Sequence, residues 1–294
     1  MTNQKGRPVV VGVDGSDTAT AAAVYAAWEA QRYGVPVRLV YAERLTPTWG
    51  PIMAPVTDEE WERDWIRHMM TTVTKAIAEA YPTVAVTSQV VTGSPAAALV
   101  AASNDASLLV LGTQSSTGIG GHLAGSVAAQ VAAHSRVPVI VARHAKHATR
   151  RGQRVVVGLD GSPESQKALA YAVEEALARG VPLEAVYAWS EPGVHDEPVR
   201  VGPDIDLSEA SARATRNLAE AVAGWADKHP DLKITYRAIH SNDPAGALAN
   251  AALDASLIVV GSRGHGGFLN LRLGSTVDAL IRSSQTPVAV VRGE

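Results

Sequence analysis

Residues 7–16 read Arg-Pro-Val-Val-Val-Gly-Val-Asp-Gly-Ser, and residues 153–162 read Gln-Arg-Val-Val-Val-Gly-Leu-Asp-Gly-Ser. An apolar run without alternation is typical of a strand that is buried on both faces of a parallel sheet. The Asp, Gly and Ser that follow are typical of a tight turn leading into a helix. Because the same strand and turn occur twice, 146 residues apart, we infer that a whole domain is duplicated.

Other matches between the two halves support the duplication. The tripeptide Gly34-Val35-Pro36 recurs as Gly180-Val181-Pro182, again at an offset of 146 residues, whereas Ser107-Leu108 recurs as Ser256-Leu257 at 149 residues. We therefore expect three residues to be inserted at one place in the second copy. The proline-containing segments after the second strands are the expected place, and they could act as lids over a ligand or be variable connections; they are residues 43–57 and 189–206.

Each copy alternates short apolar runs with longer stretches of helical periodicity. Five buried strands that alternate with helices predict an α/β fold, in which each domain is doubly wound, with a five-stranded parallel sheet and helices on both faces. Two such domains are expected in tandem, at 1–147 and 152–294, joined by a polar linker around 144–152. The expected strands are 9–13, 37–42, 84–91, 108–111 and 139–142 in the first copy, and 155–159, 183–188, 234–239, 257–260 and 288–291 in the second.

The composition excludes several classes of protein. The chain has 294 residues, of which 46% are hydrophobic and 19% charged, and its formal net charge of −3 gives no general attraction to nucleic acid or anionic lipid. The absence of cysteine excludes disulfides, thiolate metal sites and a cysteine nucleophile. No apolar run approaches the ~20 residues of a membrane helix. The polar first residues are unlike a secretory signal, so we expect a soluble cytoplasmic protein.

The residues just after the strands are the place to look for a site, because doubly wound sheets bind ligands beyond the carboxyl ends of their strands. After the first strand stand Gly12 and Asp14 in one copy, and Gly158 and Asp160 in the other. A carboxylate there can accept hydrogen bonds from a ligand hydroxyl, such as that of a ribose. It can equally serve only the turn and the helix cap, because Asp and Ser are common in both roles.

A glycine-rich stretch follows the fourth strand of the second copy. Its glycines Gly261, Gly264 and Gly274 let backbone N–H groups approach a bound group closely. Ser275 lies where a helix is expected to begin, and Arg263 adds positive charge, so we interpret the stretch as a phosphate site. The alternative is a surface loop that ends in a serine N-cap. Neither a Walker A sequence nor the dinucleotide fingerprint after the first strand is present.

The spacing Gly-x2-Gly-x9-Gly-Ser, formed by Gly261, Gly264, Gly274 and Ser275 with Asp160 upstream, resembles the signature of the universal stress protein family. The resemblance covers nearly the whole chain as two tandem domains, an arrangement similar to members from mycobacteria and other actinobacteria. It implies an adenine-nucleotide α-hydrolase-like (HUP) fold. It also implies that ATP binds with its triphosphate on the glycine loop and its ribose near the aspartate.

The resemblance further implies where adenine binds. Its contacts would come from the backbone at the end of the second strand, which is Ala42 in the first copy and Ala188 in the second. Magnesium would be held largely by phosphate oxygens, so the expected cofactors are ATP and Mg²⁺, without a metal cluster supplied by the protein.

The first copy departs from this pattern. It keeps the motif residues Gly112, Gly125 and Ser126. Ser115 replaces the second motif glycine, and Gln114 replaces the arginine. If that position requires a positive φ, a serine there costs about 1 kcal/mol or more. We therefore expect one nucleotide site per domain, with the C-terminal site the stronger.

These observations favour an ATP-binding regulator of a stress response or of signalling that is not an enzyme. The alternative is a slow ATPase, or a phosphoryl or nucleotidyl transferase, which needs a group aimed at the γ-phosphate. Candidates for that group are Asp14, Asp160 and His265. A third interpretation, an interaction module that binds no ligand, applies to the first copy alone.

The fifth strands, around 137–142 and 287–291, are expected at sheet edges, where an unprotected apolar strand invites pairing. In the family that the chain resembles, this strand commonly pairs between domains. We therefore expect the two copies to form a pseudo-dimer within the chain, with a homodimer of chains as a further interpretation. No nucleic-acid or membrane partner is expected.

Overall fold

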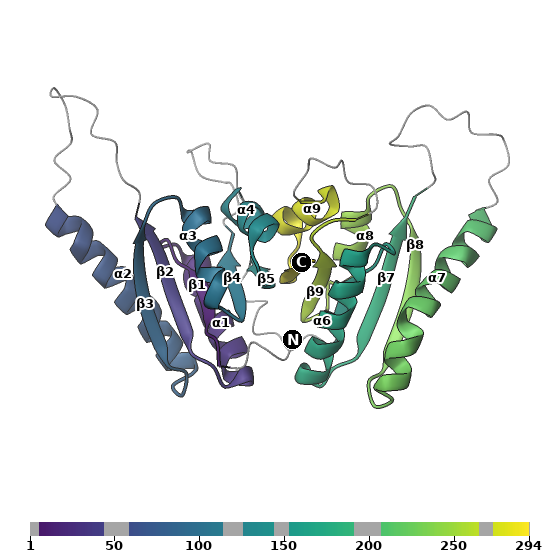
Figure 1. Cartoon of the computed structure of the whole chain (residues 1–294), viewed down its shortest axis with the longest axis horizontal. Helices are drawn as coiled ribbons and strands as arrows, with labels where there is room; N and C mark the ends of the chain where they lie inside the picture. The colour runs from purple at the N-terminus through teal and green to yellow at the C-terminus, as the bar shows by residue number, and fades with distance from the viewer. Residues whose placement is uncertain are drawn as a thin grey trace, which may run out of the picture. The chain divides into compact units, whose positions relative to one another are not determined.

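The computed structural model shows two compact units, Met1–Ala145 and Lys146–Glu294 (Figure 1). Each unit is described by itself below. The residues that the structure describes are 6–43, 59–113, 126–143, 153–190, 207–264 and 273–293.

The first unit alternates strands with helices, as the sequence predicts. Its third strand begins two residues later than expected, at Val86, and ends at Thr92. The elements are β1 (Val9–Gly12), α1 (Asp17–Tyr33), β2 (Val37–Glu43), α2 (Glu59–Ala80), β3 (Val86–Thr92), α3 (Pro95–Ala102), β4 (Leu108–Gly112), α4 (Ser126–His134) and β5 (Val139–Ala142).

The second unit repeats this order. Its helix α8 ends at Ala251. The elements are β6 (Val155–Gly158), α6 (Pro163–Arg179), β7 (Leu183–Trp189), α7 (Leu207–Lys228), β8 (Ile234–His240), α8 (Pro244–Ala251), β9 (Leu257–Gly261), α9 (Ser275–Ser283) and β10 (Val288–Val291).

The strands of each unit form a parallel sheet. Within the first unit the spatial order is β3-β2-β1-β4-β5, and within the second it is β8-β7-β6-β9-β10. The chain moves outward from the first strand to the third and then returns to the other side of the first strand. The strand order therefore reverses between β1 and β4, and between β6 and β9, which is where doubly wound sheets bind ligands.

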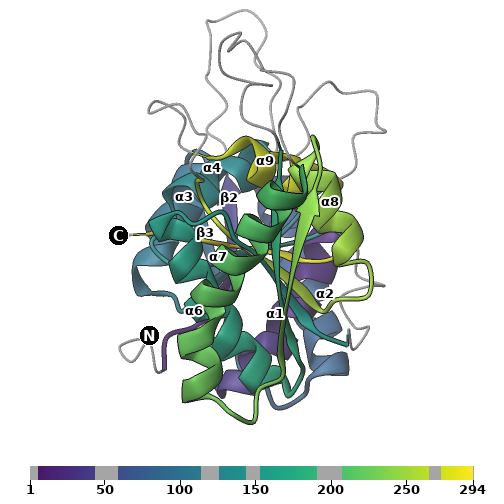
Figure 2. The same ribbon diagram turned by 90° about the vertical axis from the view of Figure 1, so that its right-hand side faces the viewer.

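Helices cover both faces of each sheet, which explains the continuous apolar strands. In the first unit α1 packs against α2, and α3 packs against α4; in the second, α8 packs against α9 and α7 against β8 (Figure 1). Figure 2 brings α7 to the front of the second unit. The valines of β1 and β6 are fully buried, as a strand between two helical layers requires. Among the described residues, no helix is long and apolar enough to cross a membrane.

The first helix of each unit begins and ends where its sequence dictates. Ser16 and Ser162 are the N-caps of α1 and α6, and each hydroxyl accepts a hydrogen bond from a backbone N–H in the first turn. Gly34 and Gly180 end these helices in the left-handed conformation, with φ of 64° and 66°. Glycine adopts this conformation without steric cost, so the repeated Gly-Val-Pro is the stop signal of both helices.

The expectation that three residues are inserted at one place is wrong. The offset between the two units is 146 residues at β2 and β7, 148 at α2 and α7, and 149 at α3 and α8. Two residues are therefore added before α7, and a third between β8 and α8. There the turn at Gly93 and Ser94 is replaced by a longer one that ends at Asp243, whose side chain caps α8 by accepting from the N–H of Gly246.

The C-cap glycines give a stability prediction of known sign. A Cβ at Gly180 would meet no atom within 4 Å, so the cost of Gly180→Ala is the left-handed backbone alone. We expect this variant to lower the free energy of unfolding by about 1 kcal/mol. The control is Gly224→Ala within α7, which also meets no atom and should raise the free energy of unfolding by about 0.5–1 kcal/mol. Urea denaturation measures both, and equal effects would contradict the assignment.

Candidate functional site

The aspartate after the first strand of each unit shapes the turn into the first helix. Oδ1 of Asp160 accepts hydrogen bonds from the N–H of Ser162 at 3.0 Å and from its hydroxyl at 2.6 Å. The Ser162 hydroxyl in turn accepts from the N–H of Ser165 at 3.2 Å. Asp14 and Ser16 repeat these distances of 3.0 and 2.6 Å in the first unit. Both aspartates thus take part in the turn and in the cap of the first helix, through Oδ1.

The same carboxylate also lies against the loop that follows β9. A Cβ built on Gly264 would collide with Oδ2 of Asp160. The φ of Gly264 lies outside the positive range, so a positive φ is not the reason for glycine here. A side chain at this position would force the Asp160 carboxylate to shift. This contact joins the ends of β6 and β9 across the point where the strand order reverses.

The first glycine of the motif has a packing role. A Cβ on Gly261 would lie 2.9 Å from the carbonyl carbon of Glu164 in the first turn of α6. In the first unit, a Cβ on Gly112 would lie 2.5 Å from the carbonyl oxygen of Thr18 in α1. Both glycines therefore let the first helix approach the end of the fourth strand. The glycines that end β1 and β6 are also closely packed. A Cβ on Gly12 would press on Leu99 of α3, and a Cβ on Gly158 would press on Leu248 of α8.

Gly274 differs from Gly261 and Gly264, because none of the described residues lies close to the place of its missing side chain. Its φ is −69°, and a Cβ there would have its nearest neighbours at 3.7 Å, an ordinary contact. It is the N-cap of α9, it provides no side-chain cap, and its N–H donates to the carbonyl of Ser262 at 2.9 Å. The serine N-cap of the alternative interpretation is therefore wrong, since Ser275 is the first helical residue and is exposed. The backbone N–H groups of the first turn of α9 therefore have no side-chain cap, and Asp278 is the acidic residue of that turn.

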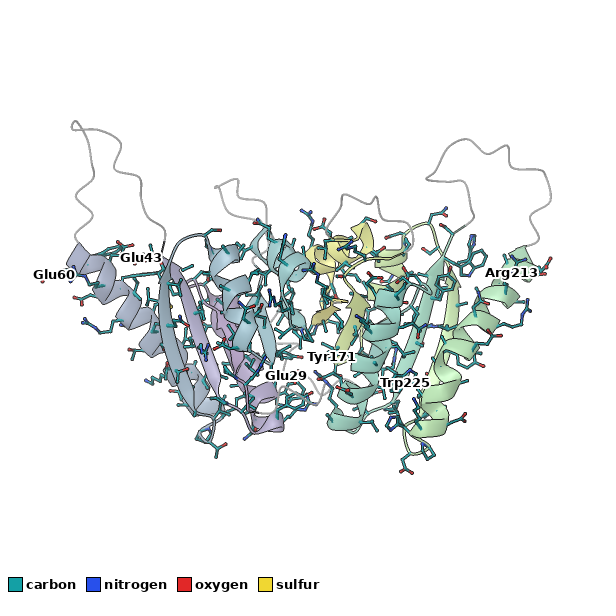
Figure 3. All side chains as sticks on the ribbon, in the orientation of Figure 1. Glu29, Glu43, Glu60, Tyr171, Arg213 and Trp225 are labelled. Carbon is teal, nitrogen blue, oxygen red and sulfur yellow. The ribbon has the colours of Figure 1, made fainter. Side chains whose placement is uncertain are left out.

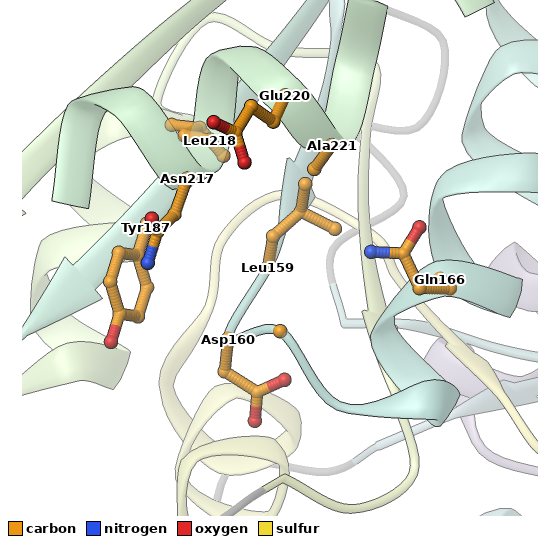
Figure 4. Close-up of a pocket in the computed structure, with 9 residues that line it drawn as sticks. Leu159, Asp160, Gln166, Tyr187, Asn217, Leu218, Glu220 and Ala221 are labelled. Atoms are coloured by element: carbon orange, nitrogen blue, oxygen red, sulfur yellow. The ribbon is translucent and has the colours of Figure 1, made fainter. Parts of the chain in front are cut away.

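A pocket of about 360 Å³ opens beside Asp160 (Figure 4). Figure 4 shows Asp160 at its base, with Gln166 of α6 on one side and Asn217 of α7 on the other. Its volume lies within the roughly 300–1,000 Å³ of small-molecule sites. The lining residues are Leu159, Asp160, Gly161, Gln166, Tyr187, Asn217, Leu218, Glu220 and Ala221.

Tyr187 on β7 lines this pocket and was missed as a site residue in the sequence. Burial, and secondly the negative charge of Asp160, raises the pKa of Tyr187, so its hydroxyl is neutral near pH 7 and can donate a hydrogen bond. The recurrence of Val-Tyr-Ala in both copies could have indicated it. The α7 residues Asn217 and Ala221 were also missed, because sequence alone does not show which face of that helix meets the first strand.

The structure brings several sequence-predicted residues of the second unit together. Asp160 touches Gly264, and Gly274 lies beside the backbone of Arg263, whose side chain is exposed. Gly158 ends β6, and Gly261 ends β9. Ala188 is not among the residues that line the pocket, although its neighbour Tyr187 is, so its backbone contact with adenine stays a prediction.

The first unit is described in part at the corresponding positions. Gly12 ends β1, Ala42 lies within β2, and Gly112 ends β4. Ser126 begins α4, although its side chain is not described. The predicted residues that lie outside the described part are Gly125, Ser115, Gln114 and His265, together with the linker and nearly all of the expected lid segments.

Fold and candidate site together define a class of protein. The chain has two tandem, doubly wound α/β units, each with an aspartate turn after its first strand and a helix start after its fourth. The profile of the universal stress protein family matches residues 6–143 and 152–292. The chain belongs to the universal stress protein family.

Curated relatives match the chain over nearly its full length. Universal stress protein Rv2005c of Mycobacterium tuberculosis is 35% identical, over 98% of this chain and 98% of that protein. Universal stress protein Rv2623 of the same species is 34% identical, over 97% and 96%. Among solved structures, a universal stress protein from Archaeoglobus fulgidus has a TM-score of 0.71 at 22% identity, and covers 98% of this chain and 97% of that one. This last likeness supports the fold.

The different roles of two motif glycines give a prediction. Gly261→Ala should lower the free energy of unfolding by about 1–3 kcal/mol, because its Cβ presses on the backbone of α6. Gly274→Ala should cost less, about 0.5–1 kcal/mol, because its Cβ has room and the loss is that of a glycine N-cap alone. Calorimetric unfolding of both variants measures the difference. Equal destabilisation would mean that Gly274 is also a packing residue.

Proposed function

We propose that the second unit binds Mg·ATP at the carboxyl ends of β6 and β9, as part of a nucleotide-dependent response to stress. One observation carries the proposal. Three features follow one another along this edge: the pocket, the carboxylate of Asp160 and the start of α9, which has no side-chain cap. They are connected by the contact of Asp160 with Gly264 and by the hydrogen bond from Gly274 to Ser262. An adenine nucleotide offers an apolar base, a ribose diol and a polyphosphate, which match these three features in that order.

The nucleoside fits the pocket by its chemistry. Leu159, Leu218 and Ala221 supply apolar walls, on which a base can be desolvated. Asn217 and Gln166 supply amide groups that can pair with a polar edge. Asp160, fixed through Oδ1, is a rigid acceptor for ribose hydroxyls.

The phosphates fit the start of α9. Backbone N–H groups of the first turn carry the positive end of the helix dipole, and the space left by Gly274 lets an anion approach them. Arg263, whose backbone lies beside Gly274, adds a positive charge to this loop. Mg²⁺ would arrive with the phosphates, whose oxygens hold most of its coordination sphere.

The proposed activity is binding, with ATP shifting the conformation that is offered to partners, rather than catalysis. A cytoplasmic location belongs to this proposal, because it requires access to ATP. Oδ1 of Asp160 is engaged by two donors of Ser162, an arrangement suited to positioning. Turnover under excess ATP tests the alternative of a slow ATPase, and several turnovers per minute would contradict the binding role.

For the first unit, we propose a site weaker than that of the second. We also propose that the units associate through β5 and β10 as a pseudo-dimer, and that chains can form a homodimer. Each of these strands has a single neighbour within its own unit, β4 or β9. Sedimentation of the full chain with and without ATP tests the homodimer.

The aspartate gives the sharpest test of the ATP site. Asp160→Asn keeps a side-chain oxygen that can accept both hydrogen bonds from Ser162, but it removes the negative charge and one acceptor. We expect affinity for Mg·ATP to fall about 10–100-fold with little change in stability. Calorimetric titration with Mg·ATP measures it. The matched control is Asp14→Asn, which makes the same change in the first unit and should leave binding in the second unchanged; equal effects of both variants would refute the assignment.

A further inference from the structure

The two units differ in what fills the space beside the aspartate turn. In the second unit, Gly161 and Tyr187 both line the open pocket. The offset of 146 residues makes Gly15 and Tyr41 their counterparts in the first unit.

In the first unit, Trp65 of α2 lies against both of these counterparts. A Cβ built on Gly15 would lie 2.9 Å from Cζ2 and 3.2 Å from Cη2 of Trp65. The rings of Trp65 and Tyr41 meet edge to face, with centroids 5.8 Å apart. The indole therefore lies against both residues whose counterparts bound the pocket of the second unit.

The rest of α2 adds bulk on the same side. Met69 has its Cγ at 3.6 Å from the Cβ position of Gly15 and is buried, whereas its counterpart Asn217 is exposed and lines the pocket. The counterpart of Trp65 in α7 is Arg213, which is exposed (Figure 3). Arg213 forms an ion pair with Glu209 at 3.7 Å. In agreement with this exchange, α1 and α2 lie closer together than α6 and α7.

More carboxylates act on Tyr41 in the first unit than on Tyr187 in the second. Burial is the largest cause that raises the pKa of Tyr41, followed by the negative charges of Glu62, Glu43 and Asp14. For Tyr187 the corresponding charge is Asp160 alone. Figure 3 shows Glu43 at the end of β2. Additional carboxylates beside the pocket oppose a polyphosphate ligand.

We infer that Trp65 is a plug that occupies the nucleoside pocket of the first unit, so that the chain holds one nucleotide, in the second unit. This inference rests on the proposed function. The indole must leave before a base can enter, and apparent affinity falls by the fraction of time for which the pocket is open. The plug, in addition to Ser115 in the glycine loop, makes the two units unequal.

The test counts bound nucleotides by native mass spectrometry at a Mg·ATP concentration that saturates the second unit. The parent chain should hold one nucleotide. Gly274→Val fills the space at the start of α9 and should hold none. Adding Trp65→Ala to that variant should restore one, with affinity for the first unit raised about tenfold or more. The matched control adds Trp61→Ala, which removes a 67% exposed tryptophan from the same helix and should restore none.

Two nucleotides on the parent chain would overturn the plug even if Trp65→Ala destabilised the first unit. A Trp65→Ala chain that is folded by calorimetry and gains no nucleotide would also overturn it. A parent chain that binds no nucleotide would refute the proposed function. The plug would then be tested in the parent chain, where Trp65→Ala should raise the number of bound nucleotides from none to one.

Discussion

The carboxylate of Asp160 is the interaction on which the organisation of the second unit's strand ends depends. It takes both donors of Ser162, which caps α6, and it lies against Gly264 beyond β9. One side chain therefore ends a strand, starts a helix and sets how closely the two loops at the strand reversal approach. A ligand that binds there meets a carboxylate already fixed in place, so little ordering is needed on binding.

The duplication preserves this frame while its contents differ. Ser16 repeats the cap of Ser162, and Gly112 repeats the close approach of Gly261 to the first helix. The two glycines are fixed by backbone packing, because an added Cβ would displace the first helix, and the two serines are fixed by the backbone N–H groups that they cap. The side of α2 that meets the aspartate turn of the first unit carries different side chains from the side of α7 that lines the pocket of the second unit.

The difference between the units consequently arises from a second helix that packs on an identical turn. Trp65 closes against Gly15 in the first unit, whereas Asn217 and Ala221 leave a pocket in the second. A tandem chain of this kind can keep one unit for a ligand and the other as a packed module. Binding and structural roles are then separated within one polypeptide, although both units share one fold.

The sequence by itself determined the duplication, the alternation of strands and helices, the caps of α1 and α6, and the strand ends at which a site should lie. These features are local, since they depend on periodicity and on residues a few positions apart. Only the tertiary structure decided what lies against Gly261 and Gly264, because Asp160 meets Gly264 from more than a hundred residues away along the sequence. It also decided that Trp65 and Tyr41 meet, since which face of a helix packs on which strand depends on contacts distant in the chain.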